Sequence, residues 1–165
     1  MTVQPFEEVV AEHGPVVLRI CRALLARVDA DDAWSETFLA AMRAYPALEP
    51  ASNVRAWLVT IAHHKAIDHL RAIQRRPAAT GQVPEAPAPD GVPEPPDEAL
   101  REALEALAPK QRAAVIYHHL AGLSYAEVGV LIGSSEAAAR RSAADGIANL
   151  RQTYRKDGAD EHHAG

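Results

Sequence analysis

The chain has 165 residues, of which 24% are charged, and a formal net charge of −5 at pH 7. Its single cysteine, Cys21, cannot form an internal disulfide, which excludes a disulfide-stapled scaffold and favours a reducing cytoplasmic environment. No apolar run approaches the roughly 20 residues of a membrane-spanning helix, and the N-terminus lacks a signal-peptide pattern.

Composition and proline distribution predict an all-α fold of two small helical domains. Alanine and leucine are abundant and aromatic residues make up only 5%, which favours helices. Residues 77–98 contain seven prolines, two glycines, five acidic residues and no basic residue. Proline removes backbone donors and fixes φ, so this segment is predicted to be a linker. It separates a domain at 1–76 from a domain at 99–156, and a flexible tail is expected at 157–165.

Two helices are predicted before residue 47. Pro15 is expected to open the first, whose apolar residues continue to Val28. Asp31 or Asp32 is expected to cap the second, which ends at Pro46. The apolar positions of the second helix are Trp34, Phe38, Leu39 and Met42.

A third helix, predicted at residues 53–76, is strongly basic. Residues 43–76 carry six basic and two acidic side chains, a net charge of +4 within an acidic chain. Cations neutralise phosphates and a flat ring can stack on an unpaired base, so this segment with Trp57 favours nucleic-acid binding. The competing interpretation is a solvated helix face with Trp57 in the core. The apolar positions drift around the axis, which predicts packing on more than one side.

The second domain begins with two predicted helices. Asp97 is expected to cap the first of them. Pro109 is expected to begin the next, which Gly122 ends.

A helix-turn-helix is predicted after Gly122. Ser124 and Glu127 form a capping box for a short helix at 125–132, and Gly133 ends it. Ser134 or Ser135 then caps a helix that runs towards Leu150. This spacing is typical of a helix-turn-helix, although tight helical turns also occur in bundles that bind no DNA.

Two long stretches resemble one known family in the right order. DDAWSETFLAAMRAY followed by NVRAWLVTIAHHKAIDHLRAIQRR is similar to region 2, and LEALAPKQRAAVIYHHLAGLSYAEVGVLIGSSEAAARR to region 4, of the extracytoplasmic-function (ECF) sigma factors. These belong to the sigma-70 family of bacterial RNA polymerase sigma factors. The resemblance implies a cytoplasmic, non-enzymatic protein without a cofactor. It would bind core RNA polymerase, recognise −10 and −35 promoter elements and promote strand opening.

The resemblance also implies roles for particular residues. The protein would bind the β′ clamp helices and the β flap of the polymerase. Asp32, Glu36 and Leu39 would contact the clamp helices, and Phe38 would lie in the core. The −10 element would be bound by Arg55, Trp57, His64, Lys65, Arg71, Arg75 and Arg76. The −35 element would be bound by Ser135, Glu136, Arg140 and Arg141.

The chain departs from the family pattern at several positions. Ser35 and His64 stand where the family often has glutamine and asparagine, which affects the base preference at the −10 element. The predicted recognition helix lacks the usual further basic residues. Asp145 there would repel phosphate, and Gly146 weakens a helix by about 1 kcal/mol. We therefore expect weak or unusual −35 binding, or a surface that meets a partner protein instead.

Other functions remain alternatives at the level of sequence. A helix-turn-helix regulator could bind duplex DNA without core polymerase. His64 and Asp68 have the i,i+4 spacing of helical metal ligands, but no third ligand accompanies them, and no catalytic motif is present. The sequence leaves open whether an anti-sigma factor holds the protein inactive.

Overall fold

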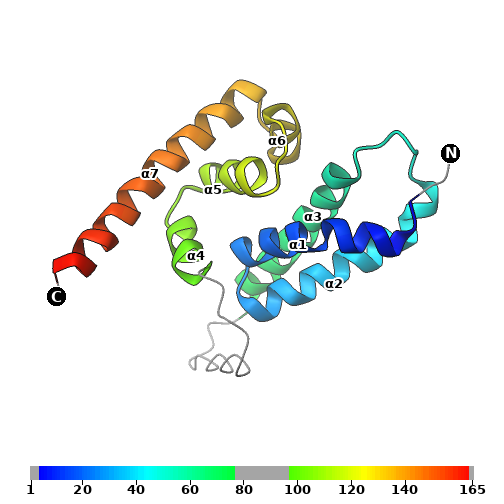
Figure 1. Cartoon of the computed structure of the whole chain (residues 1–165), viewed down its shortest axis with the longest axis horizontal. Helices are drawn as coiled ribbons and strands as arrows, with labels where there is room; N and C mark the ends of the chain where they lie inside the picture. Colours follow the sequence, from blue (N-terminus) through cyan, green and yellow to red (C-terminus); the bar gives the residue numbers. More distant parts are fainter. Residues whose placement is uncertain (1–3, 77–96, 164–165) are drawn as a thin grey trace.

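The computed structural model describes residues 4–76 and 97–163, and within these ranges the chain is helical and has no strand. Figure 1 shows two groups of helices. The first group contains α1 (Phe6–Leu24), α2 (Arg27–Ala44) and α3 (Val54–Arg75), with a short 3₁₀ turn at Tyr45–Ala47. The second contains α4 (Asp97–Glu105), α5 (Pro109–Val115), α6 (Tyr125–Ile132) and α7 (Glu136–His163). The predicted all-α fold is confirmed.

The prediction that Pro15 opens the first helix is wrong, because Pro15 lies inside α1. Proline cannot donate to the carbonyl of Ala11, but both residues are exposed, so water can satisfy that carbonyl. The preceding residue is Gly14, which has no Cβ to clash with the proline ring. The Gly14 carbonyl also accepts a hydrogen bond from Trp34 Nε1 at 3.0 Å, which joins α1 to α2.

The predicted start of the second helix is also wrong. α2 begins at Arg27 after Ala26, so Asp31 and Asp32 are exposed residues within the helix and do not cap it. Tertiary packing explains the longer helix, because Ala30 and Ala33, on either side of these acids, are fully buried in the core of the first domain. The predicted end is close, since α2 stops at Ala44.

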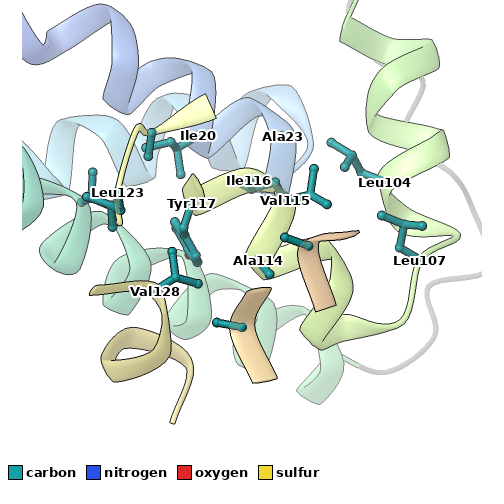
Figure 2. Close-up of a cluster of buried hydrophobic side chains, with 14 of the residues drawn as sticks. Ile20, Ala23, Leu104, Leu107, Ala114, Val115, Ile116, Tyr117, Leu123 and Val128 are labelled. Carbon is teal, nitrogen blue, oxygen red and sulfur yellow. The ribbon is translucent and has the colours of Figure 1, made fainter. Parts of the chain in front are cut away.

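The basic helix α3 forms at the predicted place. Asn53 caps it, with its side-chain oxygen accepting a hydrogen bond from the Ala56 backbone nitrogen at 3.2 Å. Leu58, Ala62 and Ala66 are buried in the core of the first domain. Val59 is buried in a second cluster, which consists mainly of residues from the second domain (Figure 2). The prediction that this helix packs on more than one side is therefore confirmed.

The capping signals around α6 and at the start of α7 are confirmed, whereas Asp97, expected to cap the first helix of this domain, is itself the first residue of α4. Ser124 and Glu127 make both hydrogen bonds of the capping box at the start of α6. Gly133 ends α6 with a φ of 69°, in the left-handed region that favours glycine. The Ser135 hydroxyl accepts a hydrogen bond from the Ala138 nitrogen at 3.1 Å, so Ser135 rather than Ser134 caps α7.

Two features of this domain differ from the prediction. The helix that begins at Pro109 continues beyond α5 as a π-helical turn, Ile116–Leu120. α7 continues to His163, beyond the boundary predicted at residue 156, and no proline interrupts it. Most of the predicted linker falls on residues 77–96, which lie outside the described residues. None of the helices described combines the length and apolar character that a membrane span requires.

Small residues along α7 bring it close to α5. Ala139, Ala143, Gly146 and Leu150 are buried at i, i+4, i+7 and i+11, which is one face of a helix. A Cβ at Gly146 would lie 2.6 Å from Val115 Cγ2 and 3.2 Å from the Gln111 carbonyl oxygen. Gly146 and two of the alanines in the atypical recognition helix thus serve packing, and they do not face the solvent.

We predict that Gly146→Ala destabilises the protein although alanine is the better helix former. The gain of about 1 kcal/mol in helix propensity is smaller than the cost of overpacking, about 1–3 kcal/mol. Urea unfolding followed by circular dichroism should show a lower free energy of unfolding. The control is Ala144→Gly at an exposed position of α7, which reports propensity alone. A stabilised Gly146→Ala protein would contradict the packing role.

Candidate nucleic-acid interface

One face of α3 carries four of the residues expected to contact the −10 element. Trp57, His64 and Arg71 are seven residues apart and Arg75 follows at i+4, so the four lie along one side of a helix with 3.6 residues per turn. His64, Arg71 and Arg75 are exposed. This side of α3 can therefore present cations and one aromatic ring to a nucleic acid along most of its length.

Trp57 is half-buried at the edge of the first domain. It packs against the core of that domain, and its ring centroid lies 6.4 Å from that of Tyr45. The Tyr45 hydroxyl donates a hydrogen bond to the Gln4 carbonyl, which ties the residues after α2 to the N-terminal segment. Trp57 thus has a fixed core side and an accessible side, so the two interpretations of this residue are compatible.

The other three predicted −10 residues do not share this face. Arg55 lies on the opposite side of α3, and its Nη1 is only 3.1 Å from the position of a Cβ at Gly122 in the second domain. Lys65 is half-buried, and Arg76 is the exposed residue that caps the C-terminal end of α3. Because side chains 160° apart on a helix cannot face one ligand, the structure separates Arg55 from Trp57.

The start of α7 brings together the residues expected to contact the −35 element. Arg140 Nη2 lies 3.3 Å from Glu136 Oε1, one turn earlier on the helix. The Arg140 guanidinium also lies over the Tyr125 ring, 5.2 Å from its centroid. Arg141 is exposed beside them. The Ser135 hydroxyl is used as the helix cap.

Tyr125 was not identified from the sequence, although it orients Arg140. Its ring stacks on His118, with centroids 3.8 Å apart and an angle of 14° between the planes. His118 Nδ1 in turn lies 2.8 Å from the Leu123 carbonyl oxygen. No sequence-spacing rule links Tyr125 to Arg140, because they lie on different helices. The stack holds the guanidinium plane in place, which favours a cation–π contact and a defined direction for its donors.

The expected polymerase-binding residues lie on the exposed side of α2. Asp32, Glu36 and Leu39 follow the i, i+4, i+7 pattern of one face, and all three are exposed. Leu39 and Met42, two of the apolar positions of this helix, each expose 51% of their surface. Glu36 Oε2 lies 3.0 Å from His69 Nε2 on α3. This face therefore combines acidic and apolar groups, which suits a protein partner more than DNA.

His63 and Tyr117 form a polar contact between the two domains. His63 Nδ1 lies 2.5 Å from the Tyr117 hydroxyl, and the rings meet edge to face with centroids 5.2 Å apart. Burial, and to a smaller extent the neighbouring His64, lowers the pKa of His63 to about 4. Burial also raises the pKa of the Tyr117 hydroxyl. At neutral pH the phenol can therefore donate its proton to an uncharged imidazole.

The structure offers little for catalysis or metal binding in the ranges described. No three His, Cys, Asp or Glu side chains converge there to hold a metal ion. Cys21 is fully buried, and burial raises the pKa of its thiol to about 12. A protonated, inaccessible thiol is a poor nucleophile, so Cys21 serves as a core residue.

Comparison with known proteins assigns both domains. Residues 9–76 match the family Sigma-70 region 2, and residues 97–150 match Sigma-70 region 4. RNA polymerase sigma factor CarQ of Myxococcus xanthus is 34% identical over 156 residues, which cover 89% of this chain and 87% of that protein. ECF RNA polymerase sigma factor SigD of Mycobacterium tuberculosis is 35% identical over 146 residues, 81% of this chain and 69% of that protein. The chain is an ECF sigma factor of the sigma-70 family.

Solved structures show the same fold as this sigma factor. The sigma factor RpoE of Bartonella quintana, in complex with the anti-sigma factor NepR, has a TM-score of 0.76 at 20% identity and covers 91% of this chain and 96% of that one. CnrH, in complex with the cytosolic domain of CnrY, has a TM-score of 0.67 at 22% identity and covers 92% of this chain and 88% of that one. The arrangement of helices is thus shared where the sequences differ greatly.

We predict that acidification destabilises this sigma factor through His63. Above pH 6.5 the imidazole is uncharged in both the folded and unfolded states. As the pH falls from 6.5 towards 4, the unfolded chain takes up the proton first, so the free energy of unfolding decreases. Urea unfolding at pH 7 and pH 5 measures this loss.

The variant His63→Asn removes the titrating group, so it should show a smaller decrease between pH 7 and pH 5. Some decrease should remain, because burial also lowers the pKa of His13. Equal pH dependence in the two proteins would contradict a role for His63.

Proposed function

We propose that this ECF sigma factor docks on core RNA polymerase through α2, holds the −10 element along α3 and reads the −35 element with the start of α7. Directing initiation at its promoters requires these three surfaces together. The observation that carries the proposal is the presence of both sigma regions in one chain, each with a helix face that exposes arginines. A regulator acting with a helix-turn-helix alone would not need the first of these faces.

Docking on the polymerase is supported by the unpartnered apolar residues of α2. Val28, Leu39 and Met42 expose 73%, 51% and 51% of their surfaces beside the exposed carboxylate of Asp32. Apolar side chains surrounded by acids are typical of a protein interface with a basic rim. We assign this face to the clamp helices of the β′ subunit.

Promoter opening is supported by the arrangement of α3. Arg71 and Arg75 stand one turn apart where they can neutralise successive phosphates, while Trp57 lies near the start of the same face. From Trp57 to Arg75 the helix rises about 27 Å. Strand separation requires no chemical step from the protein. It requires backbone cations and an aromatic surface, which offset the few kcal/mol lost for each unstacked base step.

Recognition of the −35 element is supported by Arg140 and Arg141 at the start of α7. Arg140 is oriented by Tyr125 and paired with Glu136, and Asp145 lies one turn beyond Arg141. The two acids offset the charge of the two arginines on this face. We therefore propose that −35 binding is weak and depends on simultaneous binding of polymerase and the −10 element.

We predict that Leu39→Lys abolishes function by weakening polymerase binding. A charge in the apolar part of the docking face should reduce binding to core polymerase at least tenfold, about 1.4 kcal/mol. Pull-down with core enzyme and run-off transcription on genomic fragments measure the effect. Val130→Lys is the matched control, because Val130 is an exposed apolar residue on α6, with 86% of its surface accessible. Failure of the wild-type protein to bind core polymerase would overturn the proposed function.

We also predict that Arg141→Glu weakens dependence on the −35 element. Transcription from a promoter with an intact −35 element should fall about tenfold, towards the level of a promoter that lacks it. The slope of log affinity against log salt should decrease by about one for each lost phosphate contact. Arg151→Glu makes the same charge change at an exposed position of α7 further from its start. Equal effects of the two substitutions would point to general electrostatics rather than a contact in the groove.

A further inference from the structure

Three aromatic rings from distant parts of the sequence lie next to one another in series at the edge of the first domain. The Phe6 and Tyr45 ring centroids are 5.4 Å apart, and those of Tyr45 and Trp57 are 6.4 Å apart. Both separations lie within about 4.5–7 Å, the range of favourable aromatic pairs. All three rings also pack against the core of that domain. We call Phe6, Tyr45 and Trp57 the aromatic row.

The first ring of the aromatic row belongs to a segment that is held at several points. The Tyr45 hydroxyl donates a hydrogen bond to the Gln4 carbonyl. The Gln4 side chain donates a hydrogen bond to Glu12 Oε2 at 3.0 Å. Pro5, between Gln4 and Phe6, restricts the backbone at the start of α1. Figure 1 accordingly shows the start of α1 close to the end of α2. This segment is thus fixed against Tyr45.

Tyr45 also stands at one end of the loop before α3. Its carbonyl accepts a hydrogen bond from the Leu48 nitrogen at 3.0 Å, which closes the short 3₁₀ turn. At the other end of the loop, Asn53 caps α3 in the turn that precedes Trp57. The backbone on both sides of this loop is therefore anchored, and Trp57 lies where the two anchored ends meet.

Anchoring matters for Trp57, because stacking on an unpaired base requires a ring with an accessible surface and a defined direction. A side chain that already has its binding conformation loses less conformational entropy when it binds. Tyr45 lies against Trp57 but leaves it only half-buried. Gln4 and Phe6 precede residue 9, where the match to Sigma-70 region 2 begins, so part of this support comes from outside the matched region.

We propose that Tyr45 and Phe6 are positioning residues that hold the Trp57 ring in the direction needed to stack on a base as the promoter opens. This inference rests on the proposed function, in which α3 holds the −10 element. Tyr45 acts through Trp57, and Phe6 acts through Tyr45, so neither residue needs to touch DNA. Removal of either ring should therefore impair strand opening more than it weakens the first binding of duplex promoter.

The test uses holoenzyme assembled from the full chain and core polymerase on one promoter. Tyr45→Leu keeps an apolar side chain and removes the ring. Permanganate reactivity of unpaired thymines should show about fivefold less opening than with the wild type, which is within the contribution of one aromatic pair. Gel-shift affinity in the cold, before opening, should change less than about twofold.

Two further variants serve as controls. Tyr45→Phe keeps the ring and removes only the hydrogen bond to Gln4, so opening should stay within about twofold of the wild type. Leu70→Ala removes apolar contacts from the same core, about 20 Å further along α3 than Trp57, and should leave opening unchanged. An equal loss of opening with Leu70→Ala would show general destabilisation and overturn the inference.

A double-mutant cycle with Trp57→Ala separates positioning from a purely structural role. If Tyr45 acts through Trp57, adding Tyr45→Leu to Trp57→Ala lowers opening no further. Additive losses would overturn the inference, as would normal opening by either single variant. If circular dichroism shows that Tyr45→Leu has lost its helices, Phe6→Leu takes its place in the cycle, with an expected loss of about twofold.

The proposed function is tested separately by wild-type transcription with core polymerase. A wild type that does not initiate would refute the proposed function. A wild type that initiates, together with Tyr45→Leu and Phe6→Leu variants that open the promoter normally, would refute only the positioning of Trp57.

Discussion

Helix α3 packs against both domains and leaves a third side exposed, and the rest of the structure depends on this arrangement. Leu58, Ala62 and Ala66 bury one side in the first domain, and Val59 with His63 contacts the second. The remaining side stays exposed and carries the cations available to DNA. A helix with 3.6 residues per turn has room for three such sides only if each is narrow. This explains why its apolar residues do not form a single stripe.

In the second domain, small residues on one side of α7 allow it to pack closely on α5. α7 exposes Arg140 and Arg141 in its first turns while its inner side packs on α5. Ala139, Ala143 and Gly146 allow the helix backbones to approach closely. The small residues that make this helix resemble a weakened recognition helix in sequence therefore serve its packing against α5. The exposed side of the same segment carries Glu136 and Asp145 beside Arg140 and Arg141.

The polar contacts have two roles: one set orients a side chain within a domain, and the other joins the two domains. The Arg140–Tyr125–His118 stack orients a cation within one domain. The His63–Tyr117 pair joins the two domains, and burial keeps its imidazole uncharged at neutral pH. This neutrality stabilises the contact between the domains, because a buried, unpaired charge at that position would be costly.

Local signals in the sequence determined much of this protein. The caps at Asn53, Ser124 and Ser135, the glycine stop at Gly133 and the basic character of residues 43–76 can each be read from a few neighbouring residues, because capping and charge are local properties. Pro15 and Asp31 were predicted to lie at helix starts, but both lie inside helices, because buried residues on either side of them extend α1 and α2. Only the tertiary structure decided that Arg55 faces the second domain, that Tyr125 orients Arg140 and that His63 meets Tyr117. These pairs join side chains on different helices, and no local spacing specifies how those helices pack.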